Sequence, residues 1–421
     1  MEFTLQQALD YAYENNYDLK NSAYDVEIAR KMVKQNTAIG LPQVNGGIDY
    51  TDYPVIPTTL IPGEFFGKPG TMASLKFGTT YNMALKATLT QLIYSGQYLV
   101  GLQTAKAYLE TAKQKNIKDR VDVRDVVADL YIRFLVTNEA IKILDSTFVV
   151  VSRLVEELKK NYQAGMIEDI EVDQQELSKS DLEARVTDLH SSGNLLYANL
   201  KFLLGLKDNQ ELVLMNDLKF FLAQVDHDAL MNQPFDYHAN LDYVLLKKLD
   251  YMTLMQYKLS KTAYQPTLTG FLSGSTNAQR NDWDFTNSSK VWYPTVVWGI
   301  SLQVPIWSSG SRKNSVDQAR INVEKSKVTD EKTRVGLELQ VETAKKDFSN
   351  SYAIYKNKMK GFEIALKIYE KTLAKYRQGI SSSTDMEQRY NQFLSSNNDY
   401  MQSIYTMLSQ KIRVSRLLER Y

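Results

Sequence analysis

The chain has no cysteine and only three histidines, and each shortage removes a class of function. Without cysteine there are no disulfides, no thiolate metal sites and no cysteine nucleophiles. His190, His227 and His238 share no spacing typical of metal ligands, so a solvated or capping role explains each more simply. The sequence also contains no Ser/His/Asp arrangement and no phosphate-binding glycine loop. We therefore expect no enzyme, no bound metal and no cofactor.

An excess of charge of one sign is also lacking. The 50 basic and 49 acidic side chains leave a net charge of +1, so no global field attracts nucleic acid, and we expect no nucleic-acid partner. No basic and then apolar leader precedes "MEFTLQQALDYAYENN", so we expect either a cytosolic protein or a mature form that begins with an added methionine. With 421 residues, 43% of them hydrophobic, the chain is long enough to form a large core.

Proline and glycine are absent from long stretches of the sequence. The nine prolines leave 71–233 and 306–421 free, and glycine is also missing from 102–164. At a rise of about 1.5 Å per residue, the last stretch allows a helix of about 95 Å. Apolar residues recur there at alternating spacings of three and four, which is typical of a coiled coil. The two seams of this kind are Leu144, Phe148, Val151, Val155, Leu158 and Tyr162, and Phe362, Leu366, Tyr369, Leu373 and Tyr376.

Each seam ends at a tyrosine that stands three residues before a glycine, in "YQAG" and "YRQG". Gly165 and Gly379 are expected to end the helices in a left-handed turn, after which the helical pattern resumes. Tyr162 and Tyr376 are separated by the same interval as these two glycines, which indicates a tandem duplication. Each copy is predicted to contain a helix, a proline, two extended segments, an "SG" junction, a long helix, a glycine tip and a returning helix.

The duplication predicts three parts of the chain. The first repeat is 1–206, with a β-hairpin at about 43–94, a long helix at 95–163, a tip near 165 and a returning helix. An equatorial connector follows at 207–233. The second repeat is 234–421, with a β-hairpin at about 267–307, a long helix at 309–377, a tip near 379 and a returning helix.

The extended segments have one apolar face. Val296, Trp298 and Ile300 alternate with more polar or smaller residues, which fits either a membrane β-barrel strand of about ten residues or a soluble sheet over a core. Four strands cannot close a barrel, and an open edge in lipid leaves backbone groups unpaired, so we expect the chain to oligomerise; three copies would supply twelve strands. All four tryptophans lie in the second hairpin, where we expect membrane-interface aromatics: Trp283, Trp292, Trp298 and Trp307.

Four pairs of motifs recur in the same order in both copies. They are "ALDYAYENNYDLK" with "ANLDYVLLKKLDY", "LPQV" with "QPTL", "LIYSGQ" with "PIWSSGSR", and "YQAGMIEDIEV" with "YRQGISSSTDM". Over essentially its whole length the chain resembles the TolC-like outer-membrane efflux protein family. The resemblance implies a mostly α fold with long helical hairpins and four β-strands per chain, assembled as a homotrimer. That trimer would form a 12-stranded β-barrel in outer-membrane lipid and an α-helical barrel in the periplasm.

The resemblance also implies a function and partners. Such proteins are passive exit ducts of tripartite efflux pumps or type I secretion systems, which bind a periplasmic adaptor and an inner-membrane transporter. The family's acidic constriction near the second tip falls on Asp385 and Gln388, and a gating arginine of some members falls on Ser381. The first tip carries its own acidic residues, among them Glu171, which we expect either to attract cations at the constriction or to stabilise the helix N-terminus. Adaptor docking is expected at Gly165, Met166, Gly379 and Ile380.

A soluble coiled-coil scaffold or tether is the main alternative. It explains the long helices and their seams, but it does not explain two alternating hairpins at the same place in each copy. A general diffusion porin shares the membrane barrel but has no use for helices of about 95 Å.

Overall fold

The computed structural model describes residues 1–67, 69–207 and 209–419, and most of them are helical. Two compact units are present. The first contains Met1–Glu27, Thr111–Leu249 and the chain from Lys327 onward, and the second contains Ile28–Glu110 and Asp250–Ser326. Each unit therefore combines segments from both predicted repeats.

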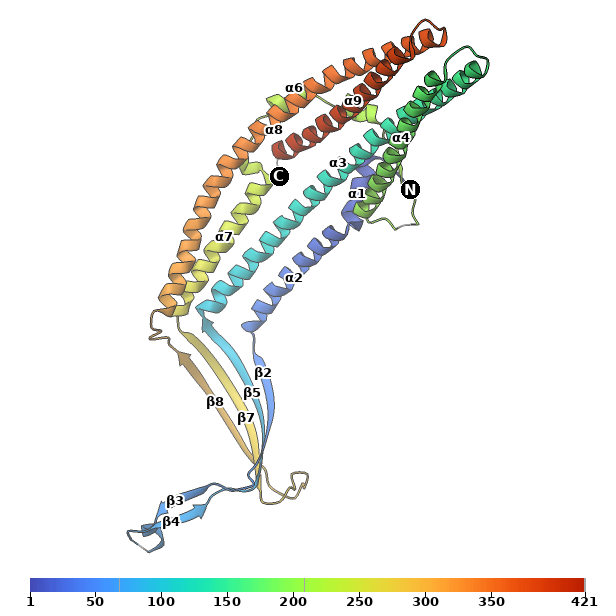
Figure 1. The fold of residues 1–421 in the computed structure, drawn as a ribbon. Helices are drawn as coiled ribbons and strands as arrows, with labels where there is room; N and C mark the ends of the chain where they lie inside the picture. The colour runs from blue at the N-terminus through green and yellow to red at the C-terminus, as the bar shows by residue number, and fades with distance from the viewer. Residues whose placement is uncertain (68, 208, 420–421) are drawn as a thin grey trace. The chain divides into compact units, whose positions relative to one another are not determined.

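The second unit contains a four-stranded antiparallel sheet (Figure 1). Its strands, in spatial order, are β2 (Gln43–Asp52), β5 (Tyr81–Ser95), β7 (Thr267–Arg280) and β8 (Tyr293–Gln303). β5 pairs with β7 along most of its length, with one irregularity between Leu92 and Tyr94, so the sheet joins strands from the two halves of the chain. The strands β2 and β8 form the two edges.

Further strands correct the expectation of four per chain. Within the Pro/Gly-rich loop, β3 (Thr58–Pro62) and β4 (Met72–Lys76) form an antiparallel pair, joined through a short 3-10 helix at Gly63–Phe66. In the first unit, β1 (Glu2–Phe3) and β6 (Val213–Leu214) pair in parallel. All four are short, so they carry too little alternation to be recognised in the sequence.

The long helices form where proline is absent. α3 (Gly96–Gln163) has 68 residues and α8 (Ser311–Arg377) has 67, and both lie close to the predicted ranges. The returning helices are α4 (Asp169–Leu204) and α9 (Ser383–Leu418). None of the helices in the described ranges is both long and apolar enough to cross a lipid bilayer. The shorter helices are α1 (Leu5–Asn15), α2 (Tyr17–Ile39), α5 (Leu218–Ala223), α6 (His227–Asn232) and α7 (Leu241–Lys261), with 3-10 turns at Tyr237–Ala239 and Thr262–Tyr264.

Two apolar clusters hold the first unit together. One is built on Tyr131, Phe348 and Met407, which are almost completely buried. The other contains most of the predicted seam residues, packed between α3, α4, α8 and α9. Tyr162, the last residue of the first seam, lies at the surface with 49% of its area exposed.

Candidate functional site

Both helical tips end in the same backbone turn. At the first, Gly165 has φ 68° and its N–H donates to the Tyr162 carbonyl at 2.8 Å; at the second, Gly379 has φ 69° and donates to the Tyr376 carbonyl at 2.9 Å. The next residue of each turn, Met166 or Ile380, donates to a carbonyl farther back and exposes its apolar side chain. A side chain at either glycine would be strained, because positive φ favours glycine.

The first tip contacts the last turn of α8. The Tyr376 hydroxyl donates to the Glu171 carboxylate at 3.3 Å, and Tyr376 itself is 8% exposed. Burial, reinforced by the Glu171 charge, raises the pKa of Tyr376 to about 12. Glu171 also lies in the first turn of α4, where the helix dipole favours a negative charge. Glu171 therefore stabilises α4 and also connects the two hairpins.

At the second tip, Asp385 is already paired. The Ser381 hydroxyl donates to one carboxylate oxygen at 2.8 Å, and the Arg389 guanidinium lies 3.3 Å from the other. The Asp385 backbone N–H donates to the hydroxyl of Ser382, which caps α9. A carboxylate held this way presents less negative charge to a passing cation than a free one does.

The predicted constriction residues therefore fall into separate groups. Ser381 and Asp385 contact each other, Glu171 contacts Tyr376, and Gln388 is exposed one turn of α9 after Asp385. Two residues were missed. Arg389 stands four residues after Asp385, a spacing at which opposite charges meet on a helix, so the sequence held that signal. The hydrogen bond from Tyr376 to Glu171 joins two hairpins, and no local sequence pattern predicts it.

Strand register gives the sheet two different faces. Residues directly opposite each other on neighbouring strands lie on the same face. One such row across the sheet is apolar and consists of Val44, Leu89, Leu272 and Trp298. On the other face a row consists of Gly47, Lys86, Ser275 and Thr295, and nearby Thr88 and Ser273 share a hydrogen bond of 2.9 Å.

The apolar face is uncovered at its edge. On β8, Val296 is 73% exposed, Trp298 76% and Ile300 65%, and on β2, Val44 is 72% exposed. Exposed apolar surface of this extent on one strand is unusual unless a lipid or protein surface covers it. The predicted alternation of apolar and polar residues is confirmed by the register.

The four tryptophans occupy different levels of the sheet. Trp283 and Trp292 precede β8 and pack around Phe285, whose ring centroid lies 6.2 Å from each of theirs. Trp307 follows the other end of β8 and is 83% exposed. Trp298 lies in the middle of β8, opposite Leu272. Three of the four therefore lie beyond the strand ends, and Trp298 does not.

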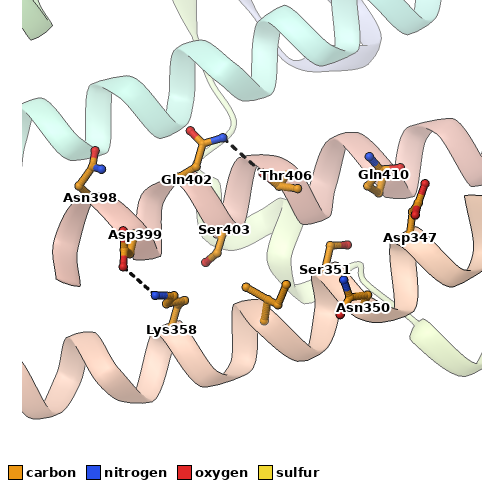
Figure 2. A pocket seen from close by; sticks show the side chains of 11 residues that line it. Asp347, Asn350, Ser351, Lys358, Asn398, Asp399, Gln402, Ser403, Thr406 and Gln410 are labelled. Carbon is orange, nitrogen blue, oxygen red and sulfur yellow. Dashed lines mark hydrogen bonds and ion pairs between the residues drawn. The ribbon is translucent and has the colours of Figure 1, made fainter. Parts of the chain in front are cut away.

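A polar cavity of about 570 Å³ lies between α8 and α9 (Figure 2). Lys358 and Asp399 point toward each other and form an ion pair of 2.7 Å, and Gln402 donates to Thr406 at 3.4 Å. Apart from Ile354, every lining side chain is polar or charged. This surface offers donors and acceptors to water but holds no catalytic arrangement. Nor do the described residues contain a group of three or more His, Asp or Glu side chains able to hold a metal ion.

Several solved structures share this fold. The Campylobacter jejuni CmeC outer membrane channel matches with a TM-score of 0.75 and 16% identity, over 98% of this chain and 85% of that one. The Vibrio cholerae outer membrane protein VceC matches with a TM-score of 0.73 and 13% identity, over 99% and 96%. The open state of the Neisseria gonorrhoeae MtrE outer membrane channel matches with a TM-score of 0.72 and 15% identity, over 98% and 88%.

Identities this low establish the fold alone, and no curated protein sequence matches the chain. The sequence itself is more specific. The model of the outer membrane efflux protein family matches residues 8–206 and 253–419, which include both tips and all four long strands. The resemblance noted from the duplicated motifs is thereby confirmed. Because that model covers most of both halves of the sequence, the chain belongs to the outer membrane efflux protein family.

Proposed function

We propose that three copies of this chain close a twelve-stranded β-barrel in the outer membrane and form the exit duct of a tripartite efflux pump or type I secretion system. The observation that carries the proposal is the four-stranded sheet, with one apolar face, one polar face and two open edges. The duct conducts passively and catalyses no reaction. A periplasmic adaptor and an inner-membrane transporter supply the remaining parts of the pump.

The open edges of the sheet support a barrel made of more than one chain. In lipid, each unpaired backbone N–H or C=O costs several kcal/mol, so a sheet must close on itself. The strands β2 and β8 have ten and eleven residues, a length that fits a tilted membrane-spanning strand. When β8 of one copy pairs with β2 of the next, both edges disappear, the apolar face meets lipid and the polar face lines water.

The helices next to the edge strands support the same contact. α8 follows β8 and exposes an apolar stripe at intervals of seven and four residues, which places its members on one side of the helix. α2 precedes β2 and exposes a second apolar stripe, whose members are seven, four and eleven residues apart and lie on one side of that helix. The α8 stripe consists of Ile321, Val328, Val335 and Leu339, exposed by 50–71%, and the α2 stripe consists of Tyr17, Tyr24, Ile28 and Ile39, exposed by 53–67%.

The remaining predicted residues take roles within this proposal. Trp283 and Trp292 mark one membrane interface, and Trp307 marks the other. The adaptor docks on the tips around Gly165, Met166, Gly379 and Ile380, where Met166 is 75% exposed and Ile380 69%. Glu171 and Asp385 supply the negative charge of the constriction, and Ser381 and Gln388 add uncharged polar side chains to it.

Light scattering with detergent subtraction tests the assembly. We expect a particle of three protein chains in detergent that aggregates when the detergent is removed, because the apolar face is then left in water. A monodisperse monomer or dimer in plain buffer would instead show that this face is covered within the protein. In that case the soluble scaffold interpretation would replace the duct.

A further inference from the structure

A second cavity, of about 450 Å³, lies in the first unit between α1, α3, α9 and the connector helices α5 and α6. Its lining includes neither a tip residue nor a residue of the four-stranded sheet. Leu9, Ile132, Phe221 and Leu408 are each less than 8% exposed and form an apolar wall. The volume falls in the range of about 300–1,000 Å³ that is typical of small-molecule sites.

Most charged groups around this cavity are paired. Arg124 lies 3.0 Å from the Asp125 carboxylate and 2.6 Å from that of Glu419. Arg416 lies 3.6 Å from the second Asp125 oxygen. These contacts place two guanidinium groups against two carboxylates, so this part of the lining has little net charge.

Lys411 is different. Its ammonium donates to the Gln224 carbonyl at 2.9 Å, and within the described part of the chain it makes no ion pair. Burial lowers the pKa of Lys411, and no neighbouring carboxylate opposes that shift. An ammonium group has three donors, so donor capacity remains. The cavity therefore combines an apolar wall with one half-buried cation that has no counter-ion among the described residues.

We propose that this cavity binds a small amphipathic carboxylate, whose head group accepts from Lys411 Nζ and whose apolar body packs on Leu9, Phe221 and Leu408. A neutral ligand would leave the ammonium without a counter-ion, and a cation would be repelled by it. A charge-assisted hydrogen bond in such a site is stronger than one in water. The cavity shares no lining residue with the tips or the four-stranded sheet, so this proposal does not rest on the proposed duct.

The simpler explanation is that Lys411 only anchors the connector. Lys345 provides the matched comparison, because its ammonium also donates to connector carbonyls, those of Met231 at 2.9 Å and Gln233 at 2.7 Å. Lys345 does not line the cavity. If anchoring is the whole role, then replacing either lysine should affect stability alone.

Isothermal titration calorimetry of the full chain in amphipol tests the site with 4-phenylbutyrate and its neutral amide, 4-phenylbutyramide. We expect saturable binding of the carboxylate to the wild type. Lys411→Met should weaken that binding by about tenfold or more while leaving the weak affinity for the amide unchanged. Lys345→Met should bind the carboxylate as the wild type does. Leu230→Trp, which fills the cavity from α6, should abolish binding of both compounds.

Two results would overturn the proposal. One is the absence of saturable carboxylate binding to a wild-type protein that is folded by circular dichroism. The other is equal carboxylate affinity for the wild type and Lys411→Met. Neither result bears on trimer formation, which light scattering reports separately.

Discussion

Arg389 controls how much negative charge Asp385 presents, because the two side chains form an ion pair one turn apart on α9. We expect Arg389→Gln to increase cation selectivity, since it leaves one more uncompensated negative charge per chain. A change of about 0.5 kcal/mol in the energy of an ion corresponds to about a twofold change in the permeability ratio. Reversal potentials of single channels in a potassium chloride gradient measure this permeability ratio. Because exposed pairs contribute only about 0–1 kcal/mol, folding should change little.

Arg334→Gln is the control for Arg389→Gln, because Arg334 also pairs with a carboxylate of its own helix, Glu331 on α8, but lies away from the tips. It should leave the reversal potential unchanged. Asp385→Asn should shift the potential in the opposite direction from Arg389→Gln. Identical potentials for Arg389→Gln and the wild type would show that this ion pair does not face the conduction path.

Among the helices, α8 exposes a regular stripe of apolar side chains. We expect Val328→Lys, in the middle of its exposed stripe, to shift the trimer toward monomers, because it places a charge where an apolar neighbour is expected. Burial of a valine side chain contributes about 1.5–3 kcal/mol, and the contact occurs once per copy. Native mass spectrometry in mild detergent measures the trimer fraction.

Gln340→Lys is the control for Val328→Lys. Gln340 is exposed on a different side of the same helix, so the introduced charge should leave the trimer fraction unchanged. Equal trimer fractions for Val328→Lys and the wild type would mean that the stripe faces water or another partner. The barrel contact between β8 and β2 would then have to hold the assembly alone.

The sequence predicted the elements better than their contacts. α3 could be predicted because it contains no proline and no glycine after Gly101, and β8 could be predicted because its apolar and polar residues alternate. Two contacts were out of reach: the pairing of β5 with β7 joins residues far apart in the chain, and Lys411 meets the connector only through tertiary packing. The strands β3 and β4 were not predicted, because they are short and flanked by proline and glycine. The division into two tandem repeats stays a prediction.

The proposed duct requires the apolar face of the sheet to contact lipid and the polar face to contact water. Leu272 and Ser273 are neighbours on β7, and they point to opposite faces because side chains alternate along a strand. Leu272 shares its row with Trp298, and Ser273 shares a hydrogen bond with Thr88. In a soluble sheet over a core, by contrast, the apolar member of such a pair would be shielded from every reagent.

The chain contains no cysteine, so a single introduced thiol reports one position without background. We expect a charged, water-soluble thiol reagent to reduce the conductance of Ser273→Cys channels in up to three steps, one per copy, because the label narrows the water-filled lumen. Leu272→Cys should keep its conductance with this reagent and react instead with a lipid-soluble maleimide. Block of Leu272→Cys with no effect on Ser273→Cys would place the apolar face inward, which a water-filled duct does not permit.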